Sequence, residues 1–80
     1  MNIELAREVV RTCFRCGREL EELMHLLKAH CDEAEYVVYA RGIATAIYNV
    51  HEEVAERALG SYPELRKEID EKVEKYGRFI

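Results

Sequence analysis

Residues 36–50 form a nearly uncharged segment that the rest of the chain is too short to cover on every side. The segment reads Tyr-Val-Val-Tyr-Ala-Arg-Gly-Ile-Ala-Thr-Ala-Ile-Tyr-Asn-Val, and Arg41 is its only charged residue. A helix that is apolar on several sides must be covered on several sides. In a chain of 80 residues, the other helices cover one face of this segment well and a second face poorly. We therefore expect the second face to dock on a partner, most simply a second copy of the chain.

Length and composition are those of a small folded helical protein. Residues 1–80 suffice for one domain, and 49% of them are hydrophobic and 35% charged, which is not the balance of a disordered chain. A monomer of this size buries only about 60% of the surface that its unfolded chain exposes, so its stability is marginal. Dimerisation would raise that stability.

Charge and hydropathy argue against two kinds of partner. The net charge is −4, and residues 19–35 hold six acids against Lys28 alone, so we expect no nucleic acid partner. The apolar segment is shorter than a bilayer-spanning helix and is interrupted by Arg41 and Asn49. The N-terminal residues lack the basic start and apolar core of a secretory signal. We expect a cytoplasmic protein without membrane contact, and three cysteines without a framework spacing agree with a reducing compartment.

Apolar residues recur in heptads over residues 3–30 and predict a first helix there. The a and d positions hold Ala6, Val9, Cys13, Cys16, Leu20, Leu23, Leu27 and His30. Asp32 and Glu35 have the spacing of a capping box and predict a second helix over about 33–59. Because the link is short, the two helices are expected to form an antiparallel hairpin. One continuous helix is the alternative, since neither Gly nor Pro interrupts residues 28–34.

The second helix has two apolar sides. One side is expected to pack on the first helix and consists of Tyr36, Ala40, Ile43, Ile47, Val50 and Val54. At about 100° per residue, the opposite side is thin and uncharged, and we expect it to be the interface with the partner. The expected interface residues are Val38, Tyr39, Gly42, Thr45, Ala46 and Asn49. Gly42 and Ala46 allow another helix to approach closely, so two hairpins are expected to pair into a four-helix core.

Turn-forming residues precede a shorter third helix over about 62–76. Gly60 is expected to stop the second helix, and Ser61 begins a capping box for the third. The apolar stripe of the third helix is narrow and consists of Leu65, Ile69, Val73 and Tyr76. Its other side carries opposite charges four residues apart. Gly77 is expected to end this helix, and residues 78–80 to fold back as a hydrophobic plug, with a short tail for a partner as the alternative.

Cys13, Cys16 and Cys31 suggest a zinc or thiol site, but helical geometry argues against one within a single chain. Cys16 and Cys31 lie about 20 Å apart along a continuous helix, whereas zinc ligands lie within about 2.3 Å of the ion. Cys13 lies about three turns into its helix, where the helix N-terminus does not lower a thiol pKa. The preferred interpretation is packing of small apolar residues. The alternative is a thiol- or metal-responsive sensor that joins these three cysteines across two chains.

No other motif supports catalysis or a bound cofactor. Glu22 and His25 match the Glu-x-x-His element of di-iron bundles, but both project away from the apolar stripe, and no second copy of the element exists. His51 opens a pattern of the zinc-protease type in which Ala55 stands at the position of the second ligand. The four arginines of residues 7–18 could clamp phosphates or an acidic peptide, but Glu4, Glu8 and Glu22 share their side of the helix, as on a solvated, ion-paired face. We therefore predict no enzymatic activity, no metal and no cofactor.

Three short motifs resemble, in their order, those of a group of small all-helical proteobacterial proteins of unknown function. The motifs are Phe-Arg-Cys-Gly-Arg at residues 14–18, Tyr-Ala-Arg-Gly-Ile-Ala-Thr-Ala-Ile-Tyr at residues 39–48 and Ser-Tyr-Pro-Glu-Leu at residues 61–65. The resemblance implies a bacterial origin and a helical hairpin, and it implies no activity. Members of the group do not share the first two cysteines of this chain, which favours their packing role.

The sequence as a whole predicts an all-α protein, in which an antiparallel hairpin and a shorter third helix pair with a second copy. The expected function is that of a small, non-catalytic interaction or regulatory module. A second copy of the chain is the expected partner, and another protein is a further candidate.

Overall fold

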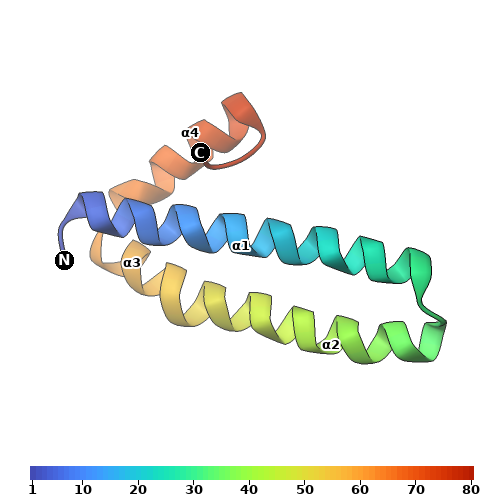
Figure 1. Cartoon of the computed structure of the whole chain (residues 1–80). Coiled ribbons are helices and arrows are strands. Elements are labelled where there is room, and N and C mark those ends of the chain that lie inside the picture. Colours follow the sequence, from blue (N-terminus) through green and yellow to red (C-terminus); the bar gives the residue numbers. More distant parts are fainter.

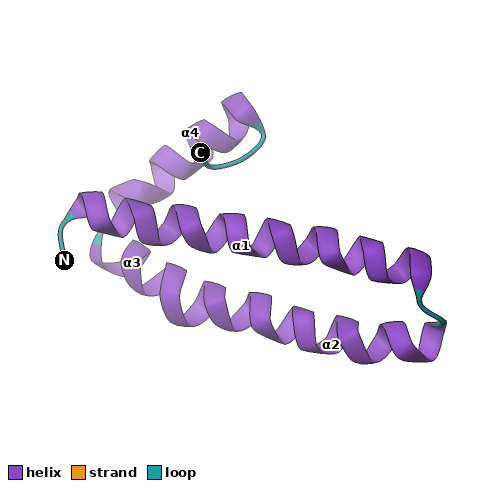
Figure 2. Ribbon diagram, in the orientation of Figure 1, coloured by secondary structure: helices purple, strands orange, loops and turns teal.

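Every regular element of the chain is helical, as the sequence predicts (Figures 1 and 2). The computed structural model describes residues 1–80. In chain order the elements are α1 (Ile3–His30), α2 (Glu33–Val50), the π-helical turn η1 (His51–Ala55), α3 (Glu56–Ser61) and α4 (Glu64–Tyr76). Helices α1 and α2 run antiparallel, so the predicted hairpin is confirmed. The pairing of two hairpins concerns an assembly and stays a prediction.

A two-residue link joins α1 to α2. Cys31 has extended backbone angles, and its N–H donates to the Leu27 carbonyl at 2.8 Å, which closes the last turn of α1. The Asp32 side chain then accepts a hydrogen bond from the Glu35 N–H at 2.8 Å, which satisfies one of the free donors at the start of α2. The predicted cap is therefore confirmed, and the alternative of one continuous helix is wrong.

The second helical run contains a π-helical turn that the apolar pattern does not reveal. The Glu56 N–H donates to the His51 carbonyl, five residues back, so this turn holds one residue more than an α-turn. One extra residue changes the direction of the following side chains by about 100° relative to an unbroken α-helix. The core-facing position consequently moves from Val54 to Ala55. The prediction that Val54 packs on α1 is wrong, because Val54 is exposed and Ala55 is fully buried.

The junction between α3 and α4 also differs from the prediction. Gly60 and Ser61 are both helical, so Gly60 does not stop the second helical run and Ser61 does not cap the third helix. No side chain caps α4, and the Leu65 N–H donates to the Tyr62 carbonyl at 3.0 Å. At the other end of α4 the prediction is confirmed. Gly77 has a φ of 77°, in the left-handed region that favours glycine, and ends the helix.

The hydrophobic core lies where α1, α3, α4 and the C-terminal segment meet (Figure 1). It consists of Ala6, Val10, Ala58, Leu59, Leu65, Ile69 and Phe79. Phe79 is only 3% exposed, and its ring meets the Phe14 ring edge-on at a centroid distance of 6.0 Å. The predicted plug at residues 78–80 is therefore confirmed, with Phe79 as its buried side chain.

The rest of the hairpin is thinly covered. Ile43 is the one buried residue of α2, and Leu23, which the heptads place in the core stripe of α1, is 41% exposed. Val73 and Tyr76 are exposed as well, because α4 diverges from α1 (Figure 1). The radius of gyration is 14.7 Å. A compact domain of this length has a radius of gyration of about 12 Å, so the single chain is elongated.

Ion pairs connect α4 to the elements beside it. Arg7 of α1 donates from Nε to Glu68 of α4 at 2.8 Å, and Arg66 of α4 lies 2.5 Å from Glu56 of α3. His51 Nε2 lies 3.1 Å from the second carboxylate oxygen of Glu56. The hydrogen bond from Arg66 is the main cause that lowers the pKa of Glu56, and the charges of Arg66 and His51 act in the same direction.

The lowered pKa of Glu56 predicts how stability depends on pH. A carboxylate with a lower pKa in the folded than in the unfolded chain stabilises the fold above its unfolded pKa, and this contribution disappears as the pH falls through the folded value. We expect the free energy of unfolding to decline below about pH 4.5. The Glu56→Gln variant should have a lower free energy of unfolding at neutral pH and a smaller decline at acidic pH. Urea titrations across this pH range measure both effects. Glu52→Gln is the control, and coincident profiles for Glu56→Gln and the wild type would contradict the prediction.

Candidate interaction surface

The six residues predicted to form the interface all lie exposed on one side of α2. Ile43, which faces α1, is buried, whereas Val38 is 70% and Tyr39 is 53% exposed. Gly42 and Ala46, on the same side, are exposed too, as are Thr45 and Asn49. The structure therefore brings the predicted residues together on a surface that the chain itself leaves uncovered.

Helix α1 extends this surface with two leucines. Leu26 is 57% exposed and Leu23 is exposed as well. At about 100° per residue, Leu23 points about 180° away from Phe14, the residue that contacts the C-terminal segment. Because α1 and α2 run in opposite directions, this geometry places both leucines on the same side of the hairpin as Gly42 and Ala46. We call this surface the open face, and it consists of Leu23, Leu26, Val38, Tyr39, Gly42, Thr45, Ala46 and Asn49.

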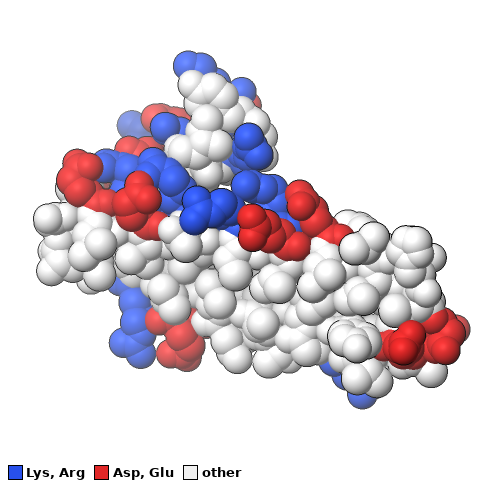
Figure 3. Space-filling model, in the orientation of Figure 1, with Lys and Arg blue, Asp and Glu red and all other residues white.

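None of the residues of the open face carries a charge. Figure 3 shows the side of the hairpin turned away from α4, where a broad uncharged area covers α1 and α2 and the charged side chains gather along its margins. The Thr45 hydroxyl donates to the Arg41 carbonyl at 2.9 Å, so this polar group is already hydrogen-bonded within α2. An apolar area with charged margins is typical of a protein–protein contact.

Gly42 has no packing role within the chain. A Cβ atom placed on it would meet nothing within 4 Å, and its φ is not positive. Neither backbone conformation nor a neighbouring element of the same chain therefore requires glycine here. The absent side chain keeps the centre of the open face flat, which suits the close approach of a helix from outside.

The cysteines occupy three different environments. Cys13 is buried, and burial is the main cause that raises the pKa of its thiol, with a smaller effect from Cys16. Cys16 is half-buried one turn further along α1, and Cys31 lies in the hairpin link. Burial also raises the pKa of Cys31, and a hydrogen bond to Glu35 adds to this rise. A raised pKa reduces the thiolate fraction on which metal binding and thiol exchange depend.

The remaining candidate ligands do not converge. Glu22 and His25 are both exposed on α1, and His51 is paired with Glu56. No three His, Cys, Asp or Glu side chains lie close enough together to hold a metal ion.

The heptad pattern does not predict a contact role for Leu26, because this residue falls outside the a and d positions. The available signal was the width of the apolar arc, since Leu23, Leu26 and Leu27 together cover more of the α1 surface than one neighbouring helix can bury. Such an arc indicates a second contact surface.

Comparison of the chain with protein-family models, with characterised proteins and with solved structures gives no match. None of the helices combines the length and the apolarity needed to cross a membrane.

Proposed function

We propose that the chain is a homodimeric, non-catalytic interaction module in which the open faces of two copies pack against each other. Two antiparallel hairpins joined in this way form a four-helix core, with Gly42 and Ala46 near its centre. The large exposed apolar area of the single chain is the observation that carries the proposal. We place the module in the bacterial cytoplasm, where the dimer would present its charged margins and α4 to a further protein.

The solvent-exposed area of the single chain supports an interface of standard size. The single chain exposes 5748 Å². A compact monomer of 9.4 kDa exposes about 5000 Å². The surplus of about 750 Å² is close to the roughly 800 Å² that each partner buries in an interface of standard size.

The composition of the open face supports an identical partner. A two-fold symmetric interface brings the same patch of both subunits together, so the patch must be complementary to itself. An uncharged patch meets this condition without like-charge repulsion, whereas a patch that carries charges of one sign would repel its own copy. Tyr39 suits the edge of such an interface, because its ring can be buried while its hydroxyl stays hydrated.

Sedimentation velocity across a range of micromolar concentrations tests the proposal. We expect a species of twice the chain mass of 9.4 kDa, with a concentration-dependent return to monomer on dilution. Intermolecular nuclear Overhauser effects between differently labelled copies should connect the residues around Gly42 to those around Ala46. A single monomeric species throughout would contradict the proposal.

A further inference from the structure

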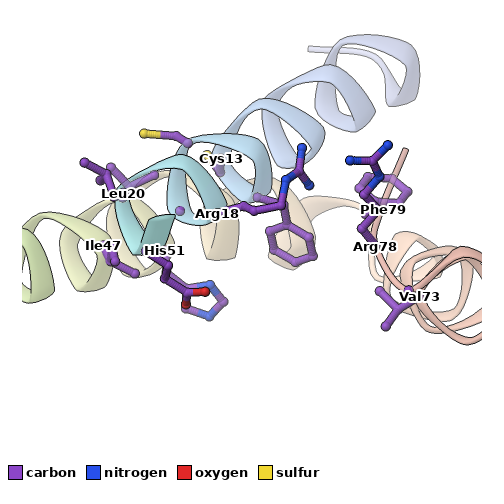
Figure 4. Close-up of a pocket in the computed structure, with 14 residues that line it drawn as sticks. Cys13, Arg18, Leu20, Ile47, His51, Val73, Arg78 and Phe79 are labelled. Carbon is purple, nitrogen blue, oxygen red and sulfur yellow. The ribbon is translucent and has the colours of Figure 1, made fainter. Parts of the chain in front are cut away.

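A cleft of about 370 Å³ lies on the side of α1 opposite the open face (Figure 4). It is bounded by α1, by the end of α2 with η1, and by α4 with the segment that follows it. Its apolar lining includes Phe14, Leu20, Ile47, Val73 and Phe79. Small-molecule sites have this character, with volumes of about 300 to 1000 Å³ and mostly apolar walls that carry a few polar groups.

Two arginines line this cleft without an acidic partner. Figure 4 shows Arg18 reaching in from α1 and Arg78 from the C-terminal segment, beside Phe79. Neither guanidinium has a carboxylate within 4.0 Å, whereas Arg7, Arg11, Arg57 and Arg66 are all ion-paired. The cleft therefore combines apolar walls with two guanidinium groups that are not ion-paired.

Glu21, the one acidic residue that lines this cleft, lies at the end that adjoins a second cleft. Glu21 and Ile47 line both the first cleft and a neighbouring one of about 360 Å³ between α1 and α2. An anion would be repelled from the Glu21 end and attracted to Arg18 and Arg78. An elongated ligand would thus be oriented, with its apolar part directed along Ile47 toward the second cleft.

We propose that this cleft binds a small amphipathic carboxylate, with the carboxylate between Arg18 and Arg78 and the hydrocarbon chain along Phe14 and Ile47. Guanidinium groups bind carboxylates through charge-assisted, often paired hydrogen bonds, and the apolar walls bury the chain. The proposal does not rest on dimerisation, because all of these residues belong to one protomer and lie away from the open face.

Decanoate is the probe for this site. Titrated into the chain labelled with ¹⁵N, it should give saturable shifts of the Gly17, Arg18 and Gly77 amides and leave the Val38, Tyr39 and Gly42 amides of the open face unaffected. Decylammonium has the same chain with the opposite charge and should bind at least about tenfold more weakly, since charge-assisted hydrogen bonds contribute roughly that factor. The double variant Arg18→Gln/Arg78→Gln should lose affinity for decanoate by a similar factor.

Arg41→Gln provides the matched control. Arg41 is also exposed and unpaired but lies on α2 outside the cleft, so decanoate should bind this variant as it binds the wild type. Equal affinity for decanoate and decylammonium would overturn the proposal, as would unchanged affinity in the double variant. Shifts confined to the open face, or no saturable shift, would overturn it too. A monomer in sedimentation contradicts the proposed dimer and leaves this test intact.

Discussion

Ala46→Glu is expected to convert the proposed dimer into monomers. In the proposed interface the new carboxylate would be buried without a cation nearby, and the two-fold symmetry would bring in two such groups. An unpaired buried charge costs about 3 to 5 kcal/mol, which weakens association by roughly a hundredfold to a few thousandfold. Sedimentation velocity at a concentration where the wild type is dimeric should then give the mass of one chain.

Ala44→Glu is a closely matched control for this experiment. Ala44 lies two residues away on the same helix and is exposed, but it belongs to the other side of the hairpin, where it lines the second cleft. We expect this variant to keep the dimer mass. If both substitutions dissociate the dimer, or neither does, the open face is not the interface.

Leu65→Ala is expected to cause the largest loss of stability in α4. Leu65 is 1% exposed and belongs to the core cluster, and truncation of a buried leucine costs about 3 kcal/mol through lost burial and the cavity left behind. This is a large fraction of the 5 to 15 kcal/mol that typically stabilises a domain. Urea unfolding at fixed protein concentration should show a lower midpoint with an unchanged slope.

Val73→Ala, two turns further along the same stripe, shows whether the effect depends on burial. Val73 is 42% exposed, so its truncation should change the free energy of unfolding by less than about 1 kcal/mol. Equal effects of the two substitutions would mean that α4 packs along its whole length, as the four-residue stripe suggests, and not only over its first turns.

The helices and most of their ends were predictable because local rules determine them. The heptads of residues 3–30 match α1. Asp32 begins α2 through its side-chain cap, and Gly77 ends α4 through its left-handed backbone conformation. Ser61 shows the limit of such rules. A serine caps a helix only when its own backbone is extended, and here the preceding helix continues through it.

The position of the core was not predictable from periodicity. Apolar spacing predicts which side of a helix is buried but not how far along the helix a neighbour extends, and the stripes of α1 and α4 are both covered over only part of their length. The open face was predicted in its α2 half, since the uncharged surface of that segment is visible in the sequence. Its α1 half depends on which side of the hairpin α4 occupies, and that is determined by tertiary contacts.

The π-helical turn makes residues 51–55 the place where the second helical run can change in length without a change in the core. The wide turn absorbs one residue, so loss of any one of the exposed residues 51–54 would restore an uninterrupted α-helical ladder. Ala55, Ala58 and Leu59 would keep facing the core, because each would move one position back along an α-helix that no longer carries the extra residue. Single-residue deletions at 51–54 are thus compatible with the fold, whereas a charged substitution of the buried Ala55 is not, and related chains should vary by one residue in the spacing between Ile43 and Leu59.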